Sequence, residues 1–271
     1  MKAKYSVSAV HPETSALKKL LEAIEAPEVL ARQRQILIKP NLINDSPPPV
    51  TVPVELVSEL IDVIRGWSTA NIIVAEGVGA PHLETPQVFR KHGYEKMAQA
   101  KGVQLLDLNH APVKKLERSD CRVFPSMHLP EILFESFVIS LAMLKAHSLA
   151  DVTLSMKNML GCAPPAYYQQ GGHWKKSVFH SRMHEAIFEL NRYRCPDLNI
   201  IDARVGLAEY HLGGATCDPP VRKIIAGFDP VAVDAEGATL LGFDWRSIGH
   251  IAMADGVLGR VEESTPVSFP I

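Results

Sequence analysis

The sequence predicts an α/β protein with a mainly parallel sheet and helices on both faces. Short β-branched runs alternate along the chain with stretches whose apolar residues recur at helical spacing. The β-branched runs are apolar throughout, which is typical of strands buried on both faces. The length of 271 residues suits one α/β unit, and no linker separates the patterned segments. We therefore expect a single domain over residues 1–271.

The expected elements follow from these patterns in chain order. The segments with strand composition are 5–9, 35–38, 71–75, 103–106, 137–141, 198–201 and 221–226. The segments with helical periodicity and plausible caps are 14–26, 54–65, 86–92, 183–192 and 231–241. Residues 108–136 fit neither pattern over their length, and they predict a small β excursion or subdomain.

Composition excludes several classes of function. Twenty-eight Lys and Arg against thirty Asp and Glu give a net charge of −2, so the chain lacks the broad basic surface of a nucleic-acid-binding protein. No apolar run approaches the eighteen residues of a membrane span, and the N-terminus lacks a signal-peptide core. The four cysteines lie far apart, without zinc-ribbon or ferredoxin spacing. We expect a cytoplasmic protein with reduced thiols and no partnership with nucleic acid or membrane.

Ionisable residues repeatedly follow the predicted strands, and these positions suggest one shared site. Because the carboxyl ends of parallel strands meet at one edge of a sheet, the residues that follow them converge on one crevice. Lys39 and Asn41, like Lys145 and His147, are two residues apart and project together from an extended chain. The expected ligand-binding residues are Lys39, Asn41, Glu76, Lys145, Lys157, Asn158, Gly213, Gly214 and Asp229.

Several lysines at one crevice require an anion or paired carboxylates, because desolvating ammonium groups together is costly. The sequence therefore predicts a small ligand that carries phosphate or carboxylate. His147 is the expected general acid or base, and Asp202 is expected either to orient this histidine or to join a metal site. Asp229 precedes Pro230 at a predicted helix start, so capping of that helix is its alternative role.

His180 and His184 form the candidate metal site. Their i, i+4 spacing places two imidazoles on one face if the segment is helical, which suits a divalent metal with a third ligand. The segment lacks the glutamate of the HExxH signature, so it does not indicate a metalloprotease. Hydrogen-bonded or capping histidines are the alternative interpretation.

Four stretches together resemble the family known as domain of unknown function 362. They are ILIKPNLI, LKAHSLADVTLSMKNMLG, IDARVGLAEYHLGG and AGFDPVAVDAEGATLLGFD, in the family's order over about residues 35–259. The resemblance matches Lys39 to Asn41 with the family's KPN, Lys145 and His147 with its KxH, and Lys157 and Asn158 with its KN. It also matches Asp202 with a strand-terminal aspartate, and Asp229 and Asp234 with DPxAxD.

The resemblance implies a shared site in an uncharacterised bacterial and archaeal family that is sometimes present in iron–sulfur proteins. The chain departs from the pattern at Glu76, where aspartate is more usual, and it lacks the appended ferredoxin-like cysteine motifs. Three hypotheses follow: an enzyme acting on an anionic small molecule, a metal-binding or redox accessory protein with an iron–sulfur partner, and a non-catalytic ligand-binding module. The reaction class, the cofactor and any homo-oligomer stay open.

Overall fold

The computed structural model describes residues 4–9, 16–262 and 265–268, and it confirms the predicted α/β fold class. Within these residues, nine strands form one sheet in the order β11-β1-β10-β9-β7-β2-β3-β4, with β8 paired to β7. The five neighbours β9, β7, β2, β3 and β4 are parallel to one another. The strands are β1 (Lys4–Ala9), β2 (Gln35–Pro40), β3 (Asn71–Glu76), β4 (Gln104–Asp107), β7 (Phe137–His147), β8 (Asp151–Thr153), β9 (Leu198–Leu207), β10 (Lys223–Gly227) and β11 (Thr265–Ser268).

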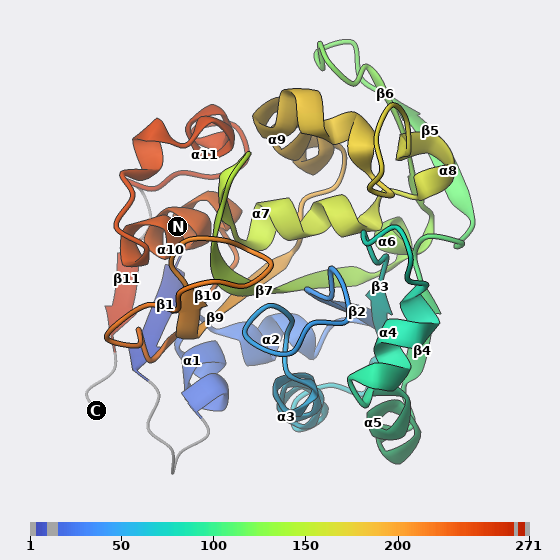
Figure 1. Ribbon diagram of the computed structural model, residues 1–271. Helices are drawn as coiled ribbons and strands as arrows, with labels where there is room; N and C mark the ends of the chain where they lie inside the picture. Colours follow the sequence, from blue (N-terminus) through green and yellow to red (C-terminus); the bar gives the residue numbers. More distant parts are fainter. Residues whose placement is uncertain (1–3, 10–15, 263–264, 269–271) are drawn as a thin grey trace.

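Helices cover both faces of the sheet, as predicted (Figure 1). One face carries α1 (Ala16–Ala23), α2 (Ala26–Leu30), α3 (Val54–Arg65), α4 (Thr85–Lys91) and α5 (Tyr94–Lys101). The other carries α7 (Ser155–Asn158), α9 (Met183–Tyr193), α10 (Pro230–Leu240) and α11 (Gly249–Ala254). Alternate strand residues supply the two cores: Ile36 and Ile38 pack against the first set of helices, and Leu37 packs against the second. Burial of both faces explains why the strands are apolar throughout.

The expected β excursion at 108–136 is present as a separate two-stranded antiparallel sheet. It pairs β5 (Val113–Glu117) with β6 (Ser126–Pro130) and is followed by α6 (Ile132–Glu135). A second short helix, α8 (Pro165–Tyr168), docks on this hairpin through Tyr168, whose hydroxyl accepts a hydrogen bond from the His128 amide at 2.8 Å. The interpretation of residues 1–271 as one domain stays a prediction.

Two strands are longer than predicted, which changes the place of three candidate residues. β7 continues past 141 to His147 because β8 pairs with its end, Lys145 opposite Thr153 and His147 opposite Asp151. β9 likewise continues past 201 to Leu207. Lys145, His147 and Asp202 therefore lie within strands, and the expectation that Asp202 ends its strand is wrong.

The predicted helix 14–26 is interrupted. Its first two residues lie outside the described part of the chain, α1 ends at Ala23, and α2 begins at Ala26. Glu25 between them has a φ of 62°, a left-handed conformation that no helix interior allows. Pro27 lacks the amide that a continuing helix would need.

Strand β10, which follows β9 in the chain, runs in the direction opposite to the parallel strands of the sheet. β10 is antiparallel to β9, with Gly227 opposite Asn199 and Lys223 opposite Ala203. The carboxyl end of β10 therefore meets the amino end of β9. Residues that follow β10 lie at the edge of the sheet away from Lys39 and Glu76.

Candidate functional site

A buried ion pair stands where β2 and β3 end. Lys39 Nζ lies 2.6 Å from Glu76 Oε1, and both side chains are at most 2% exposed. Glu76 also accepts hydrogen bonds from the Leu42 amide at 2.8 Å and the Gly77 amide at 2.7 Å. Both carboxylate oxygens thus have partners, and the carboxylate of Glu76 is satisfied within the protein.

Two asparagines connect this ion pair to β7 and α7. Asn158 Oδ1 accepts from Lys39 Nζ at 3.0 Å and from Asn41 Nδ2 at 3.2 Å, and Asn158 Nδ2 donates to the Lys39 carbonyl at 3.1 Å. Lys145 Nζ donates to Asn41 Oδ1 at 2.6 Å and to the Val50 carbonyl at 2.8 Å. The structure therefore brings the predicted Lys39–Asn41 turn against Lys145 and Asn158. Through these two bonds, Lys145 stabilises the conformation of the Lys39–Asn41 turn.

The short helix α7 is held at its start by a buried carboxylate from α10. Asp234 accepts hydrogen bonds from the Ser155 amide at 2.8 Å and the Met156 amide at 3.0 Å. These amides are donors that a helix start leaves unsatisfied. Ser155 Oγ also donates to Asn199 Oδ1 at 2.7 Å. The backbone that carries Lys157 is thereby fixed from two sides.

A pocket of about 220 Å³ opens above this network. Its wall combines polar groups from β2, β3, β7 and α7 with apolar side chains from the loops, a composition typical of small-molecule sites. Lys39, Asn41, Glu76, His147, Thr153, Lys157, Asn158, Gly161, Trp174, Lys176, Phe179, His180, Tyr210 and His211 are among the lining residues. Of the residues that the structure describes, Glu76 is the one carboxylate that lines this pocket, and Lys39, Lys157 and Lys176 line it as well. The pocket therefore has an excess of cationic side chains.

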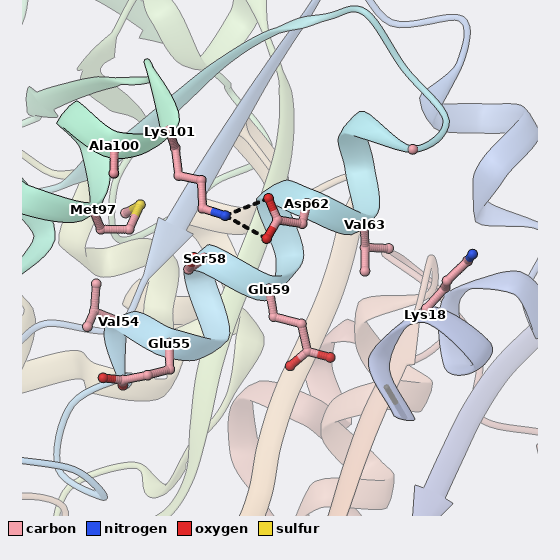
Figure 2. A pocket seen from close by; sticks show the side chains of 11 residues that line it. Lys18, Val54, Glu55, Ser58, Glu59, Asp62, Val63, Met97, Ala100 and Lys101 are labelled. Carbon is pink, nitrogen blue, oxygen red and sulfur yellow. Dashed lines mark hydrogen bonds and ion pairs between the residues drawn. The ribbon is translucent and has the colours of Figure 1, made fainter. Parts of the chain in front are cut away.

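A second hollow is larger, about 660 Å³, and lies between α1, α3 and α5 (Figure 2). It is an open surface depression, and at its wall the Lys101 and Asp62 side chains point toward one another and pair at 2.6 Å. None of the polar groups predicted to form a site lines it. The predicted site residues gather at the smaller pocket and not at this larger hollow.

Two pocket lysines have a lowered pKa. Burial, and then the neighbouring Lys39 ammonium, lower the pKa of Lys157 from 10.5 to about 7. Burial also lowers the pKa of Lys176 to about 7, against the opposing effect of Glu76. Lys176 Nζ donates to Asn109 Oδ1 at 2.7 Å and to the Ala163 carbonyl. Lys157, which is half-buried, has no hydrogen bond or ion pair to any residue that the structure describes.

His147 lies beside Lys157 as a neutral imidazole. Its Nδ1 accepts hydrogen bonds from the Leu149 amide at 3.0 Å and the Ala150 amide at 3.2 Å. Burial, and then Lys157, lower the pKa of His147 far below its usual range. The ring proton therefore resides on Nε2, which is available as a donor. The His211 ring stacks on it with centroids 3.8 Å apart, and burial lowers the pKa of His211 to about 3.

Six predicted site residues do not line the pocket: Lys145, which lies beneath it in the network described above, His184, Asp202, Asp229, Gly213 and Gly214. Asp202 accepts two hydrogen bonds from the Arg204 guanidinium, at 2.9 and 2.6 Å. Asp229 lies at the opposite edge of the sheet because β10 is antiparallel, and it caps α10 by accepting from the Val231 amide at 2.9 Å. Gly213 and Gly214 lie two and three residues beyond His211, which does line the pocket. Their expected ligand-binding role stays a prediction.

The two histidines predicted to share a helix face lie on different elements. His180 belongs to the 3-10 helix Ser177–Arg182 and lines the pocket, whereas His184 lies in the first turn of α9. His184 Nδ1 instead lies 3.2 Å from His250 Nδ1. In the described chain, Glu84, Asp107 and His110 do bring ligand atoms within 4.8 Å of one another, but Glu84 already binds Lys175.

The sequence interpretation missed Lys176, His211 and Thr153. Lys176 follows the aromatic, glycine-rich segment that precedes His180, and only the folding of this segment over the site places it in the pocket. His211 lies in the loop after β9, four residues beyond the strand. Thr153 is buried, lines the pocket and has a hydroxyl without a hydrogen-bond partner among the described residues. A hydroxyl left unsatisfied at a pocket wall is available to a ligand.

Gly161 is required by the ion pair, and this predicts the effect of a substitution. A Cβ at this position would lie 2.5 Å from Glu76 Oε1 and 2.6 Å from Lys39 Nζ. Gly161→Ala should therefore displace the pair and lower the free energy of unfolding by about 1–3 kcal/mol, the usual cost of overpacking. Chemical denaturation monitored by circular dichroism measures this cost. An unchanged transition midpoint would show that the Lys39–Glu76 pair can move without loss.

Fold and pocket define an α/β protein with a lysine-rich pocket at the carboxyl edge of a parallel sheet. The model of the family described as domain of unknown function (DUF362) matches residues 36–239. This match covers more than half of the chain, and the protein belongs to that family. The chain is also similar to a thylakoid-associated protein of Synechocystis sp., with 24% identity over 250 residues that cover 88% of this chain and 72% of the relative.

The helices bear on the expectation that the protein does not cross a membrane. None of the helices in the described part of the chain has both the length and the apolar character needed to span one. The expected cytoplasmic location stays a prediction.

Proposed function

We propose that this protein is an enzyme whose pocket binds a small molecule carrying a carboxylate or phosphate group. The observation that supports this proposal most directly is the amine of Lys157, which has no partner within residues 4–9, 16–262 and 265–268. In the same part of the chain, the pocket has one lining carboxylate, Glu76, and it already has three donors. A cation beside no free carboxylate is stabilised by an anion from outside the protein.

The proposed roles refine the hypothesis drawn from the sequence. Lys39 and Lys145 are bonded to protein oxygens, so they support the site, and Lys157 holds the anion. Asn158 orients Lys39 by accepting a hydrogen bond from its ammonium group. His147 acts as a hydrogen-bond donor through Nε2, because its Nδ1 is occupied by two backbone amides. Lys157, with its pKa of about 7, is the group that exchanges protons near neutral pH.

Calorimetric titration of the full chain with inorganic phosphate and with acetate tests the binding step. We expect binding at pH 6.5 and an affinity at least about tenfold lower in Lys157→Met, since a hydrogen bond to a charged group contributes about 1.5–3 kcal/mol. Lys96→Met is the matched control, because Lys96 is an exposed lysine on α5 outside the pocket. Equal affinities in all three proteins, or no binding to the unchanged protein, would refute the proposal.

A further inference from the structure

The amine of Lys157 differs from the other two lysines that line the pocket, because it has no hydrogen-bond or ion-pair partner among the residues that the structure describes. Lys39 Nζ bonds Glu76, Asn158 and the Pro40 carbonyl, and Lys176 Nζ bonds Asn109 and the Ala163 carbonyl. Lys157 Nζ makes no such bond within the described residues, although it lines the same pocket. An amine that is only an anion holder needs its proton, whereas an amine that is also a nucleophile needs to lose it.

The backbone that carries Lys157 is anchored on both sides. The residues just before it are held by Asp234, which binds the Ser155 and Met156 amides. The residue just after it, Asn158, is bonded to the Lys39 carbonyl and to Ser140 Oγ at 3.0 Å. The flanking residues thus restrict where the Lys157 side chain starts, and this side chain lines the pocket.

The surroundings favour the neutral amine at physiological pH. Burial and the Lys39 ammonium lower the pKa of Lys157 to about 7, so about half of the molecules carry a free amine there. Desolvation together with a neighbouring cation is a known means of activating a lysine nucleophile. His147 Nε2 and the unsatisfied Thr153 hydroxyl supply donors to a carbonyl oxygen or a carboxylate nearby.

We infer that Lys157 forms an imine with a small anionic aldehyde or 2-oxo acid, an inference that rests on the proposed function and names its substrate class. The Nζ lone pair attacks the carbonyl carbon, and the carbon–oxygen π pair moves to oxygen. One proton passes from nitrogen to that oxygen, giving a carbinolamine. A second proton, from solvent, lets the hydroxyl leave as water as the nitrogen lone pair forms the carbon–nitrogen double bond. The product is a protonated imine, whose positive charge stays beside the substrate anion.

Reductive trapping of the full-length protein with glyoxylate and sodium cyanoborohydride tests the inference. Glyoxylate is a small aldehyde that carries a carboxylate, and reduction converts its imine into a stable carboxymethyl-lysine that peptide mass spectrometry locates. At pH 7 we expect at least about tenfold more label on Lys157 than on Lys96, because Lys96 is an exposed lysine outside the pocket, with no neighbouring site to hold the carboxylate of glyoxylate. Inorganic phosphate should protect Lys157, and acetaldehyde, which lacks the anion, should label it less.

The variant Lys157→Arg distinguishes anion binding from imine formation. This variant keeps a cation and loses the nucleophile, so we expect it to bind phosphate and to acquire no label in the 157 peptide, with an unchanged circular dichroism spectrum as evidence of folding. Phosphate binding by the unchanged protein without a label on Lys157 would overturn the imine and leave the proposed function standing. Absence of phosphate and glyoxylate binding would overturn both. Equal labelling by acetaldehyde and glyoxylate would overturn the anionic substrate class.

Discussion

Replacing Lys39 by methionine is expected to lower the free energy of unfolding by about 3–5 kcal/mol, the usual cost of removing one partner of a buried ion pair. Methionine fills a similar volume but leaves the Glu76 carboxylate without its cation in a site that is 2% exposed. It also removes the bond from Lys39 Nζ to Asn158 Oδ1. Urea denaturation of the variant at pH 7 measures the loss.

A matched exposed pair provides the control for this prediction. Lys101 and Asp62 are also 2.6 Å apart, but they lie at the surface between α5 and α3 (Figure 2). Lys101→Met should cost no more than about 1 kcal/mol, because solvent screens such a pair. The double variant Lys39→Met with Glu76→Gln should recover part of the loss. If Lys39→Met and Lys101→Met lowered the free energy of unfolding by similar amounts, burial of the Lys39–Glu76 pair would not contribute to stability.

Lys157→Met is expected to stabilise the protein at pH 7, by about 1–2 kcal/mol after allowing for the partial exposure of the side chain. The pKa of Lys157 is lowered from 10.5 to about 7 on folding. Between these values the unfolded chain binds a proton that the folded chain does not, so Lys157 makes stability rise with pH across this window. Below pH 7 the full cost is present, and above 10.5 it disappears. The variant should lack this rise.

Thermal unfolding of the two proteins from pH 6 to pH 10 measures the effect, and the stabilisation by methionine should shrink steadily towards the alkaline end. Saturating phosphate should reverse the order of stability at pH 7, since an anion that binds the protonated amine stabilises only the protein that has it. A methionine variant less stable than the unchanged protein at every pH would show that Lys157 has a structural role. Residues that reduce stability in the absence of ligand are typical of functional sites.

The pocket combines a rigid, hydrogen-bonded network with one lysine that stands apart from it. The Lys39–Glu76 pair with its asparagines is internally satisfied and rigid, and it places a second cation beside Lys157. Lys157 is held by its neighbours but has no partner of its own among the described residues. Preorganised groups around one uncommitted amine are what binding and catalysis of a small anion require.

The sequence by itself determined seven strands of the large sheet and most of the long helices, because uninterrupted apolar runs and helical periodicity are local properties. It did not predict β8 or β11, two short strands at the ends of the pairing network. It also located Lys39, Asn41, Glu76, His147, Lys157 and Asn158, which line the pocket, since polar residues at the ends of buried parallel strands converge.

Only the tertiary structure decided which of the predicted residues share the pocket and which of its lysines is uncommitted. Strand direction is set by pairing between distant segments, so the reversal of β10, which moves Asp229 to the far edge, has no local signature. The same holds for the pairing of Lys39 with Glu76 and of Lys145 with Asn41, which span 37 and 104 residues. These long-range contacts occupy Lys39 and Lys145 but leave Lys157 without a partner among the described residues, because a side chain's partner depends on the neighbours that folding brings to it.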